Sequence, residues 1–216
     1  MAEILAPGKQ QDGVGGGGGG FHEGDFGGYG SGPPPGTSRR IYRTGMWLGL
    51  LAISMVFLAF TSAYIVRSGL SDDWLPIELP RLLWGNALLL FLSSLTIERT
   101  RKALNGGRRA ECNHWLAVTT ALGVAFLVGQ LLVWRQLASH GVYVTTNPSS
   151  SFFYLLTATH GLHLLGGVMA LLYIVWQAWH YQLGPAKRTL VEVTAIYWHF
   201  MDGLWIYILL LLSLWR

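Results

Sequence analysis

The stretch GMWLGLLAISMVFLAFTSAYIV, residues 45–66, decides the fold class of this chain. It contains no charged residue, and a run of about 20 apolar residues is long enough for a helix to cross the hydrocarbon of a bilayer. The composition agrees, because 51% of the 216 residues are hydrophobic and only 12% are charged. A typical soluble domain carries about 25% charged residues. The sequence therefore predicts an integral membrane protein.

Four further apolar runs follow, so the sequence predicts an all-α membrane protein built as a bundle of five transmembrane helices. The runs are residues 82–97, 115–134, 152–179 and 193–215. The run at 82–97 is short, and we expect it to draw in residues from about position 77. The last two runs are joined by a short basic loop and are expected to be antiparallel neighbours.

Residues 1–40 differ from the rest of the chain, since they are polar, rich in glycine and proline, and include six consecutive glycines at positions 15–20. Such a composition cannot bury enough apolar surface to offset the entropy lost on ordering. We expect a disordered tail over 1–40 and the five-span bundle over 41–216.

The basic residues predict the orientation of the bundle in the membrane. If the five spans alternate, ten Lys and Arg residues lie on one side and three on the other, and the richer side is cytoplasmic. This places the N-terminus in the cytoplasm and the C-terminus outside. The ten are Arg39, Arg40, Arg43, Arg99, Arg101, Lys102, Arg108, Arg109, Lys187 and Arg188, and the three are Arg67, Arg81 and Arg216. The net charge of +4 therefore reflects topology and does not indicate a nucleic-acid partner.

Ionisable side chains in the last two spans are the candidate functional residues. Such groups usually face the bundle interior and pair with one another. His199 follows Glu192 by seven residues and precedes Asp202 by three, so all three lie close to one helix face. His160 and His163 lie one turn apart in the fourth span. We expect a histidine–carboxylate network near mid-membrane in which Asp202 or His199 meets His163, with Glu192 closer to the cytoplasmic interface.

Three interpretations of this network stay open. Two histidines one turn apart and a carboxylate are ligands for zinc or iron. Intramembrane carboxylates also line proton or ion paths. The interpretation that we favour is structural, because buried polar side chains commonly bridge membrane helices, and such a network fixes helix packing or holds a lipid head group.

Smaller polar and glycine residues give further expectations about packing. Gly161, Gly166 and Gly167 would let another helix approach closely. Gln130 is expected to form an interhelical hydrogen bond. The serines and threonines of the second and third spans can bond to their own helix backbone, so no function is expected of them.

Two motifs in combination resemble subunit III of the haem–copper respiratory oxidases. SFFYLLTATHGLHLLGGVMAL, residues 151–171, resembles the family's helix with an H-G-x-H signature. VEVTAIYWHFMDGLWIYIL, residues 191–209, resembles its last helix, where a Glu is followed by W/Y-W-H-F-x-D-x-x-W, with Trp205 in the final position. The runs from 45 and 82 resemble the first two core helices, so the resemblance covers about residues 41–216.

The resemblance implies a chain without a redox centre of its own, in a complex that oxidises cytochrome c, reduces oxygen to water and pumps protons. Haem and copper would belong to partner subunits, with subunit I as the principal contact and subunit II also present. The implied role is support of proton uptake, stability and bound phospholipid. Cytochrome c or quinol would act on the complex. The short five-helix form favours a bacterial plasma membrane.

One position departs from the family pattern. Many members carry a glutamate after the serine of the first core helix, whereas here Ser54 is followed by Met55, so no role attached to that carboxylate is expected. Subunit III of a quinol oxidase and a subunit associated with nitric oxide reductase remain alternatives. A small proton or solute transporter is a distant one, because transporters commonly show internal repeats and none is visible.

Overall fold

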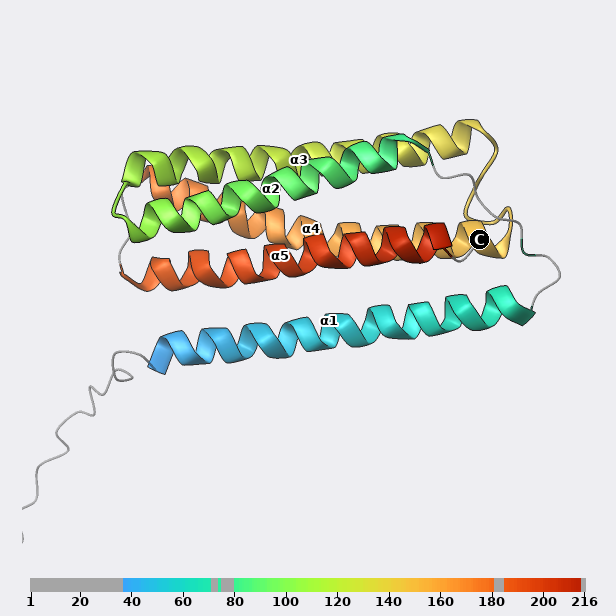
Figure 1. Cartoon of the computed structure of the whole chain (residues 1–216), viewed down its shortest axis with the longest axis horizontal. Helices are drawn as coiled ribbons and strands as arrows, with labels where there is room; N and C mark the ends of the chain where they lie inside the picture. Colours follow the sequence, from blue (N-terminus) through green and yellow to red (C-terminus); the bar gives the residue numbers. More distant parts are fainter. Residues whose placement is uncertain (1–36, 71–73, 75–79, 181–184, 215–216) are drawn as a thin grey trace, which may run out of the picture. The chain divides into compact units, whose positions relative to one another are not determined.

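A computed structural model of the chain describes residues 37–70, 74, 80–180 and 185–214, and within them it contains five α-helices and no strand (Figure 1). The helices are α1 (Thr37–Leu70), α2 (Leu82–Asn105), α3 (Arg109–Ser139), α4 (Pro148–Trp179) and α5 (Pro185–Leu214). All five belong to one compact unit, Pro33–Arg216. The prediction of an all-α fold with five helices is confirmed.

Four of the five helices contain a segment long and apolar enough to cross a membrane. These segments are Arg40–Leu70, Arg109–Ser139, Pro148–Trp179 and Arg188–Leu214. Helix α2 differs because its apolar part ends at Ile97 and the charged residues Glu98 and Arg99 follow directly. Residues 75–79, from which a longer second span was expected to draw, lie outside the described residues. The crossing of the membrane by α2 therefore stays a prediction.

The helices extend beyond the apolar runs at most of their ends. Helix α1 begins at Thr37, inside the predicted tail of residues 1–40, and the rest of that tail lies outside the described residues. Helix α4 begins at Pro148, four residues before the predicted run at 152–179, with a complete cap. The Asn147 side chain accepts a hydrogen bond from the Ser150 N–H at 2.8 Å, and the Asn147 N–H donates to the Ser150 hydroxyl at 3.1 Å. With Pro148 in the first turn, this capping box fixes the start of the helix.

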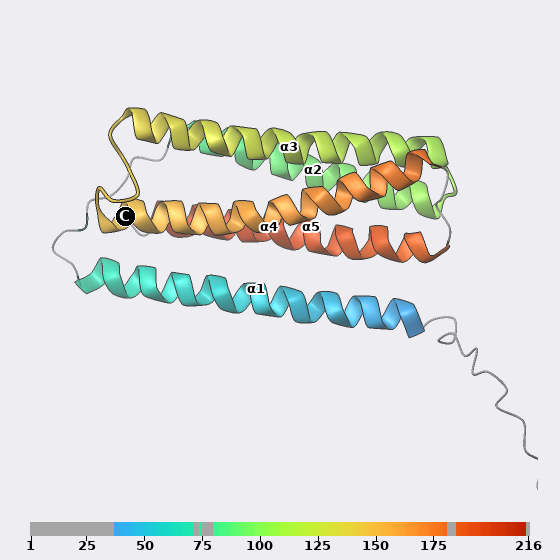
Figure 2. The ribbon, with the colours of Figure 1, turned by 180° about the vertical axis from the view of Figure 1, so that it is seen from behind.

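Helices α2 to α5 pack into a closed set in which each contacts two others, α2 with α3 and α5, and α4 with α3 and α5. Helices α2 and α3 form an antiparallel hairpin through a tight turn at Gly106 and Gly107, where Gly107 adopts a positive φ of 71°, a conformation that glycine accepts without strain. The predicted pairing of α4 with α5 is confirmed. Helix α1 contacts only α4 and α5 among the described helices (Figures 1 and 2).

The centre of the four-helix set is filled by Trp198 of α5, which is fully buried. Two glycines make room for its indole, since a Cβ on Gly123 of α3 would lie 2.7 Å from Cη2 of Trp198, and one on Gly167 of α4 would lie 3.2 Å from its Cζ3. Of the three glycines expected to allow close helix approach, only Gly167 does so. No atom outside their own helix backbone and chain neighbours lies within 4 Å of a Cβ built on Gly161 or Gly166.

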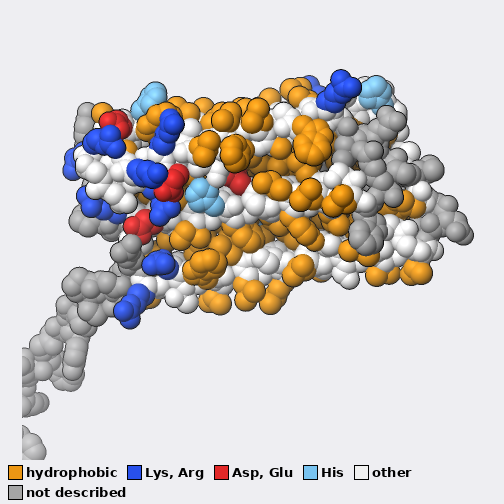
Figure 3. All heavy atoms as spheres, viewed as in Figure 1, with side chains coloured by type: hydrophobic (Ala, Val, Ile, Leu, Met, Phe, Trp, Pro, Cys, Tyr) orange, Lys and Arg blue, Asp and Glu red, His pale blue; other side chains and the backbone are white. Residues whose placement is uncertain are grey.

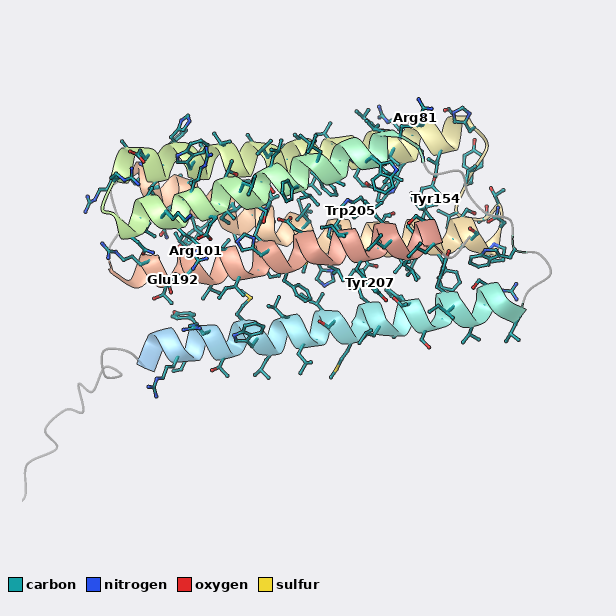
Figure 4. The ribbon with its side chains drawn as sticks, viewed as in Figure 1. Arg81, Arg101, Tyr154, Glu192, Trp205 and Tyr207 are labelled. Carbon is teal, nitrogen blue, oxygen red and sulfur yellow. The ribbon has the colours of Figure 1, made fainter. Side chains whose placement is uncertain are left out.

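Helix α1 joins the others through aromatic and hydroxyl contacts. The Tyr207 hydroxyl of α5 donates to the Thr61 hydroxyl of α1 at 2.9 Å, and Figure 4 shows Tyr207 on the side of α5 that faces α1. About one turn further along α1, the rings of Tyr64 and Phe152 of α4 meet edge to face at 5.7 Å between centroids. These contacts leave the opposite side of α1 exposed and largely apolar.

Candidate functional site

His160 of α4 lies in the interior of the helix set and has no exposed surface. Its ring is 5.0 Å from the Trp205 ring of α5 and 6.0 Å from the Phe126 ring of α3, measured between centroids. Neither ring nitrogen of His160 has a hydrogen-bond partner among the described residues. The H-G-x-H histidine at this position therefore faces the core between α3 and α5.

His163 points in a different direction, towards α1. Its ring is 6.0 Å from the Phe57 ring, and its Nδ1 lies 2.8 Å from the Thr159 carbonyl one turn earlier. The Tyr197 hydroxyl of α5 donates to the His163 carbonyl oxygen at 2.7 Å. Because the two histidines face different helices, they do not form one ligand pair. The described ranges also contain no group of three or more His, Cys, Asp or Glu residues that could hold a metal ion.

His199 of α5 takes part in a polar chain with α2. Its Nδ1 lies 2.6 Å from the Ser94 hydroxyl, and its Nε2 lies 3.8 Å from a carboxylate oxygen of Glu98. Glu98 also accepts a hydrogen bond from the Arg101 guanidinium at 2.8 Å. The side chains of His199, Glu98 and Arg101 are 39%, 38% and 36% exposed. Figure 3 shows basic, acidic and histidine side chains gathered on this side of α2 and α5.

Asp202 is nearly buried, with 7% of its surface exposed, and neither carboxylate oxygen has a hydrogen-bond partner among the described residues. The expected contact of Asp202 or His199 with His163 is not formed in the part of the chain that the structure describes. The physical reason is direction, since His199 faces α2 and His163 faces α1. The carboxylate that does meet a histidine is Glu98.

Glu192 is half-buried near the start of α5, towards the end of the bundle where Arg101 of α2 lies and away from Trp205 (Figure 4). The expectation that Glu192 lies closer to the cytoplasmic interface than Asp202 does stays a prediction. Met55, the position that departs from the family pattern, is 60% exposed on α1. A carboxylate at this position would face away from the other described helices, because the side of α1 that packs on them carries Phe57 and Thr61.

Several residues that the sequence interpretation treated as local connect helices. Ser93 donates to the Leu90 carbonyl at 2.7 Å, but it also accepts a hydrogen bond from the Trp198 indole at 2.8 Å. Thr96 of α2 and Thr119 of α3 share a hydrogen bond at 2.8 Å. The expected bonds to their own helix backbone are present, and several of the same hydroxyls also link helices. The sequence contained a signal, since Ser93, Ser94 and Thr96 cluster in the last five residues of the short apolar run at 82–97.

Gln130 of α3 was expected to form an interhelical hydrogen bond. It is 3% exposed, yet neither its amide nitrogen nor its amide oxygen has a partner among the described residues. The prediction of a direct interhelical bond was therefore wrong.

Two grooves lie near the connection between α3 and α4. One has a volume of about 830 Å³ and is lined by the end of α1 and the start of α4, including Arg67 and Phe152. The other has a volume of about 530 Å³ and runs along the outer side of α3 to the following loop. Its walls are mostly apolar, with Arg135 and Tyr143 in them. Both grooves combine an apolar wall with one arginine.

Comparison with known proteins identifies the family. Residues 37–216 match the family described as cytochrome c oxidase subunit III. The chain is 34% identical over 177 residues to cytochrome c oxidase subunit 3 of Synechocystis sp., covering 79% of this chain and 74% of that one. It is 32% identical over 177 residues to cytochrome c oxidase subunit 3 of Thermostichus vulcanus, covering 78% and 84%.

A third relative has a different electron donor in its name. The chain is 27% identical over 173 residues to cytochrome bo(3) ubiquinol oxidase subunit 3 of Pseudomonas putida, covering 75% of this chain and 80% of that one. The family match spans all five helices and both polar motifs. The chain therefore belongs to the subunit III family of the haem–copper oxidases and is a multi-pass membrane protein.

Proposed function

We propose that this chain is the non-catalytic subunit III of an aerobic terminal oxidase that oxidises cytochrome c, reduces oxygen to water and pumps protons. Its role is to support proton uptake, to stabilise the complex and to hold phospholipid. The observation that carries this proposal is the family match over residues 37–216, which includes every described helix. Haem and copper belong to the partner subunits, and the complex lies in a bacterial plasma membrane with the N-terminus of this chain in the cytoplasm.

The choice of cytochrome c over quinol as donor rests on the relatives. Over the aligned residues, the two cytochrome c oxidase subunits from Synechocystis sp. and Thermostichus vulcanus are 34% and 32% identical to this chain, against 27% for the ubiquinol oxidase subunit. Because the donor acts on other subunits of the complex, this support is indirect. The quinol oxidase is the second candidate.

The side of α2 and α5 that carries Ser94, Glu98, Arg101 and His199 is the proposed contact with subunit I. Three of these side chains are about one-third exposed, and two of them, Glu98 and Arg101, come just after the apolar part of α2. Charged groups that face lipid at this depth are costly, so they usually face protein or water instead. A partner helix with polar side chains would remove them from lipid and complete their hydrogen bonds.

The two grooves support the proposed lipid contact. Each offers apolar side chains for an acyl chain and an arginine, Arg67 or Arg135, at the predicted outer end of a span. An arginine guanidinium binds a phosphate through paired charge-assisted hydrogen bonds. A head group of a phospholipid would occupy this position while its chain follows the groove.

Purification of the complex through a tag on this chain tests the proposal directly. We expect a large haem- and copper-bearing chain to co-purify and to give a reduced-minus-oxidised haem spectrum. Oxygen consumption with reduced cytochrome c as donor should exceed that with a quinol. A preparation that oxidises only quinol would identify the second candidate, and one that reduces nitric oxide in place of oxygen would identify the nitric oxide reductase alternative. A colourless preparation of this chain alone would contradict the oxidase assignment.

Deletion of this chain tests the supporting role. We expect the remaining complex to keep its haem spectrum and to reduce oxygen, but more slowly and with faster loss of activity during turnover. Loss of the haem signal together with all oxygen reduction would contradict a supporting role.

A further inference from the structure

Four buried polar side chains, one from each of helices α2 to α5, carry polar atoms without a hydrogen-bond partner among the described residues. Asn86 of α2 is 2% exposed, Gln130 of α3 is 3% exposed, and His160 of α4 and Trp205 of α5 have no exposed surface. The atoms without a partner among the described residues are Nδ2 of Asn86, Nε2 and Oε1 of Gln130, both ring nitrogens of His160 and Nε1 of Trp205. Buried polar atoms are nearly always hydrogen-bonded to protein or to ordered water, so this set requires an explanation.

The contacts between helices place Gln130 and His160 at the same level of the bundle. On α3, Gln130 lies one turn after Phe126 and one turn before Trp134. Phe126 packs on His160 with ring centroids 6.0 Å apart. The Trp134 indole donates to the Thr157 hydroxyl at 3.2 Å. Gln130 is therefore bracketed by two residues that both contact the turn of α4 from residue 157 to 160.

Trp205 and Asn86 belong to the same level. The Trp205 ring lies 5.0 Å from the His160 ring and 5.0 Å from the Phe126 ring. The Asn86 carboxamide occupies the space that a Cβ on Gly129 would need, and Gly129 directly precedes Gln130. We call these four side chains, Asn86, Gln130, His160 and Trp205, the polar layer.

Asp202 supplies a carboxylate next to the polar layer. It precedes Trp205 by three residues on α5, so it lies about one turn away on nearly the same face. Both of its oxygens are without a partner among the described residues, although only 7% of its surface is exposed.

The donors and acceptors of the polar layer fit a small neutral ligand. Trp205 and the Asn86 amide nitrogen can only donate, Gln130 can donate and accept, and a neutral imidazole such as that of His160 has one donor and one acceptor. A cation could not bind to the donor-only groups. A water molecule can accept from Trp205 or Asn86 and donate to Gln130 or His160, and buried waters typically make about three such bonds.

We propose that ordered water occupies the polar layer and links α2, α3, α4 and α5 at this level through hydrogen bonds to Asn86, Gln130, His160 and Trp205. The four side chains of the polar layer do not include the polar chain of Ser94, His199 and Glu98, which lies closer to the other end of α2. It does not depend on which electron donor the complex uses.

Trp198 provides an internal control for a test of this proposal. It lies on α5 two turns before Trp205, and it is also without exposed surface. Its indole N–H donates to the Ser93 hydroxyl at 2.8 Å, and its ring fills the space beside Gly123 and Gly167. Trp198 is thus equally buried but surrounded by protein atoms.

Hydroxyl-radical footprinting by brief X-ray exposure tests the proposal on the complex purified through this chain. Radicals form from water, so a buried side chain is oxidised quickly only where water is bound next to it. We expect Trp205 to be oxidised several-fold faster than Trp198, as measured by mass spectrometry of the α5 peptides. Equal rates for the two tryptophans would overturn the proposal. A faster rate at Trp205 that falls when a metal chelator is added would also overturn it, in favour of a bound metal.

A Gln130→Leu substitution tests the same point from the other side of the layer. It keeps the side-chain volume but removes a donor and an acceptor, so Trp205 oxidation should fall towards the rate of Trp198 while Trp198 itself is unchanged. An unchanged rate at Trp205 would contradict the proposal.

If the variant does not assemble, a high-resolution density map of the unmodified complex decides. A peak within hydrogen-bond distance of Gln130 and His160 is expected, and a direct Gln130–His160 hydrogen bond with no peak would overturn the proposal.

Discussion

Trp198 and Trp205 lie two turns apart on the same face of α5, and neither has exposed surface, yet their surroundings differ. Trp198 fits against two glycines and donates to Ser93. Trp205 lies between His160 and Phe126, and its indole N–H has no partner among the described residues. The interior of this protein therefore contains two kinds of core, one closed by packing and one that leaves polar atoms unsatisfied by protein.

The difference shows that burial alone does not determine how a residue contributes to the stability of the protein. At Trp198 the contribution is contact area and one hydrogen bond between helices, so changes in volume should be costly. At Trp205 the ring contributes contact area, but the indole N–H forms no hydrogen bond with a described protein group. Substitutions at matched positions can separate these contributions.

The largest effect is expected from Trp198→Ala, which removes the indole between three helices. Loss of a buried tryptophan leaves a cavity and costs about 3–5 kcal/mol in the free energy of unfolding. The single cysteine, Cys112, is buried, so its alkylation on heating, followed by mass spectrometry, reports unfolding of this chain. Trp176, which is 57% exposed, is the control, and Trp176→Ala should shift the midpoint little. Similar shifts for the two variants would contradict the central role of Trp198.

The next largest effect is expected from Gly167→Ala, compared with Gly166→Ala. The added methyl group at Gly167 would meet the rings of Tyr197 and Trp198 at 3.0 and 3.2 Å, and such overpacking costs about 1–3 kcal/mol. At Gly166 the added Cβ meets no atom within 4 Å, so the higher helix propensity of alanine should be neutral or stabilise by up to about 1 kcal/mol. The same Cys112 assay measures both. If Gly166→Ala were destabilised and Gly167→Ala were not, the close packing of Trp198 against Gly167 would be contradicted.

A smaller effect should distinguish Trp198→Phe from Trp205→Phe. Both changes remove a similar volume, but only the first removes a hydrogen bond between protein side chains, the one to Ser93. We expect Trp198→Phe to cost up to about 1 kcal/mol more, the net contribution of a typical hydrogen bond, because the water proposed beside Trp205 keeps its other bonds, whereas the Ser93 hydroxyl loses its donor. The comparison uses the thermal midpoint of each variant. Equal costs would show that the Trp205 indole N–H has a bond of similar strength.

The smallest effect on stability is expected from Glu98→Gln, outside both cores. The Glu98 carboxylate pairs with Arg101 and lies near His199, but all three side chains are about one-third exposed, and such pairs contribute about 0–1 kcal/mol. If this side contacts subunit I, less haem should co-purify with the variant while the Cys112 midpoint stays unchanged. Full retention of haem in stringent detergent would argue against this contact.

The helices were predictable because long apolar runs with few charges are typical of membrane-spanning helices. The partners of the polar residues were not, because spacing along a helix gives the face of a side chain only roughly. His160 and His163 are three residues apart, yet one faces Trp205 of α5 and the other Phe57 of α1. Gly166 and Gly167 are adjacent, and only Gly167 meets a neighbouring helix.

Glu98 shows a different reason for a missed site residue. It comes directly after the apolar run of α2, where the sequence suggests a cytoplasmic loop. In the structure the helix continues to Asn105, so Glu98 remains on a helix and reaches His199. A charged residue at the end of an apolar run can therefore belong to a site when the helix continues beyond that run.

The contacts of α1 have a consequence for synthesis of the chain. Helix α1 is made first, but among the described helices it contacts only α4 and α5, which are made last. During translation it must therefore reside in the bilayer without its final neighbours until almost the whole chain has been inserted. Because residues 45–66 carry no charge, α1 can remain in the bilayer without protein neighbours. Helix α2, whose apolar part is shorter, can pair with α3 as soon as the hairpin has formed.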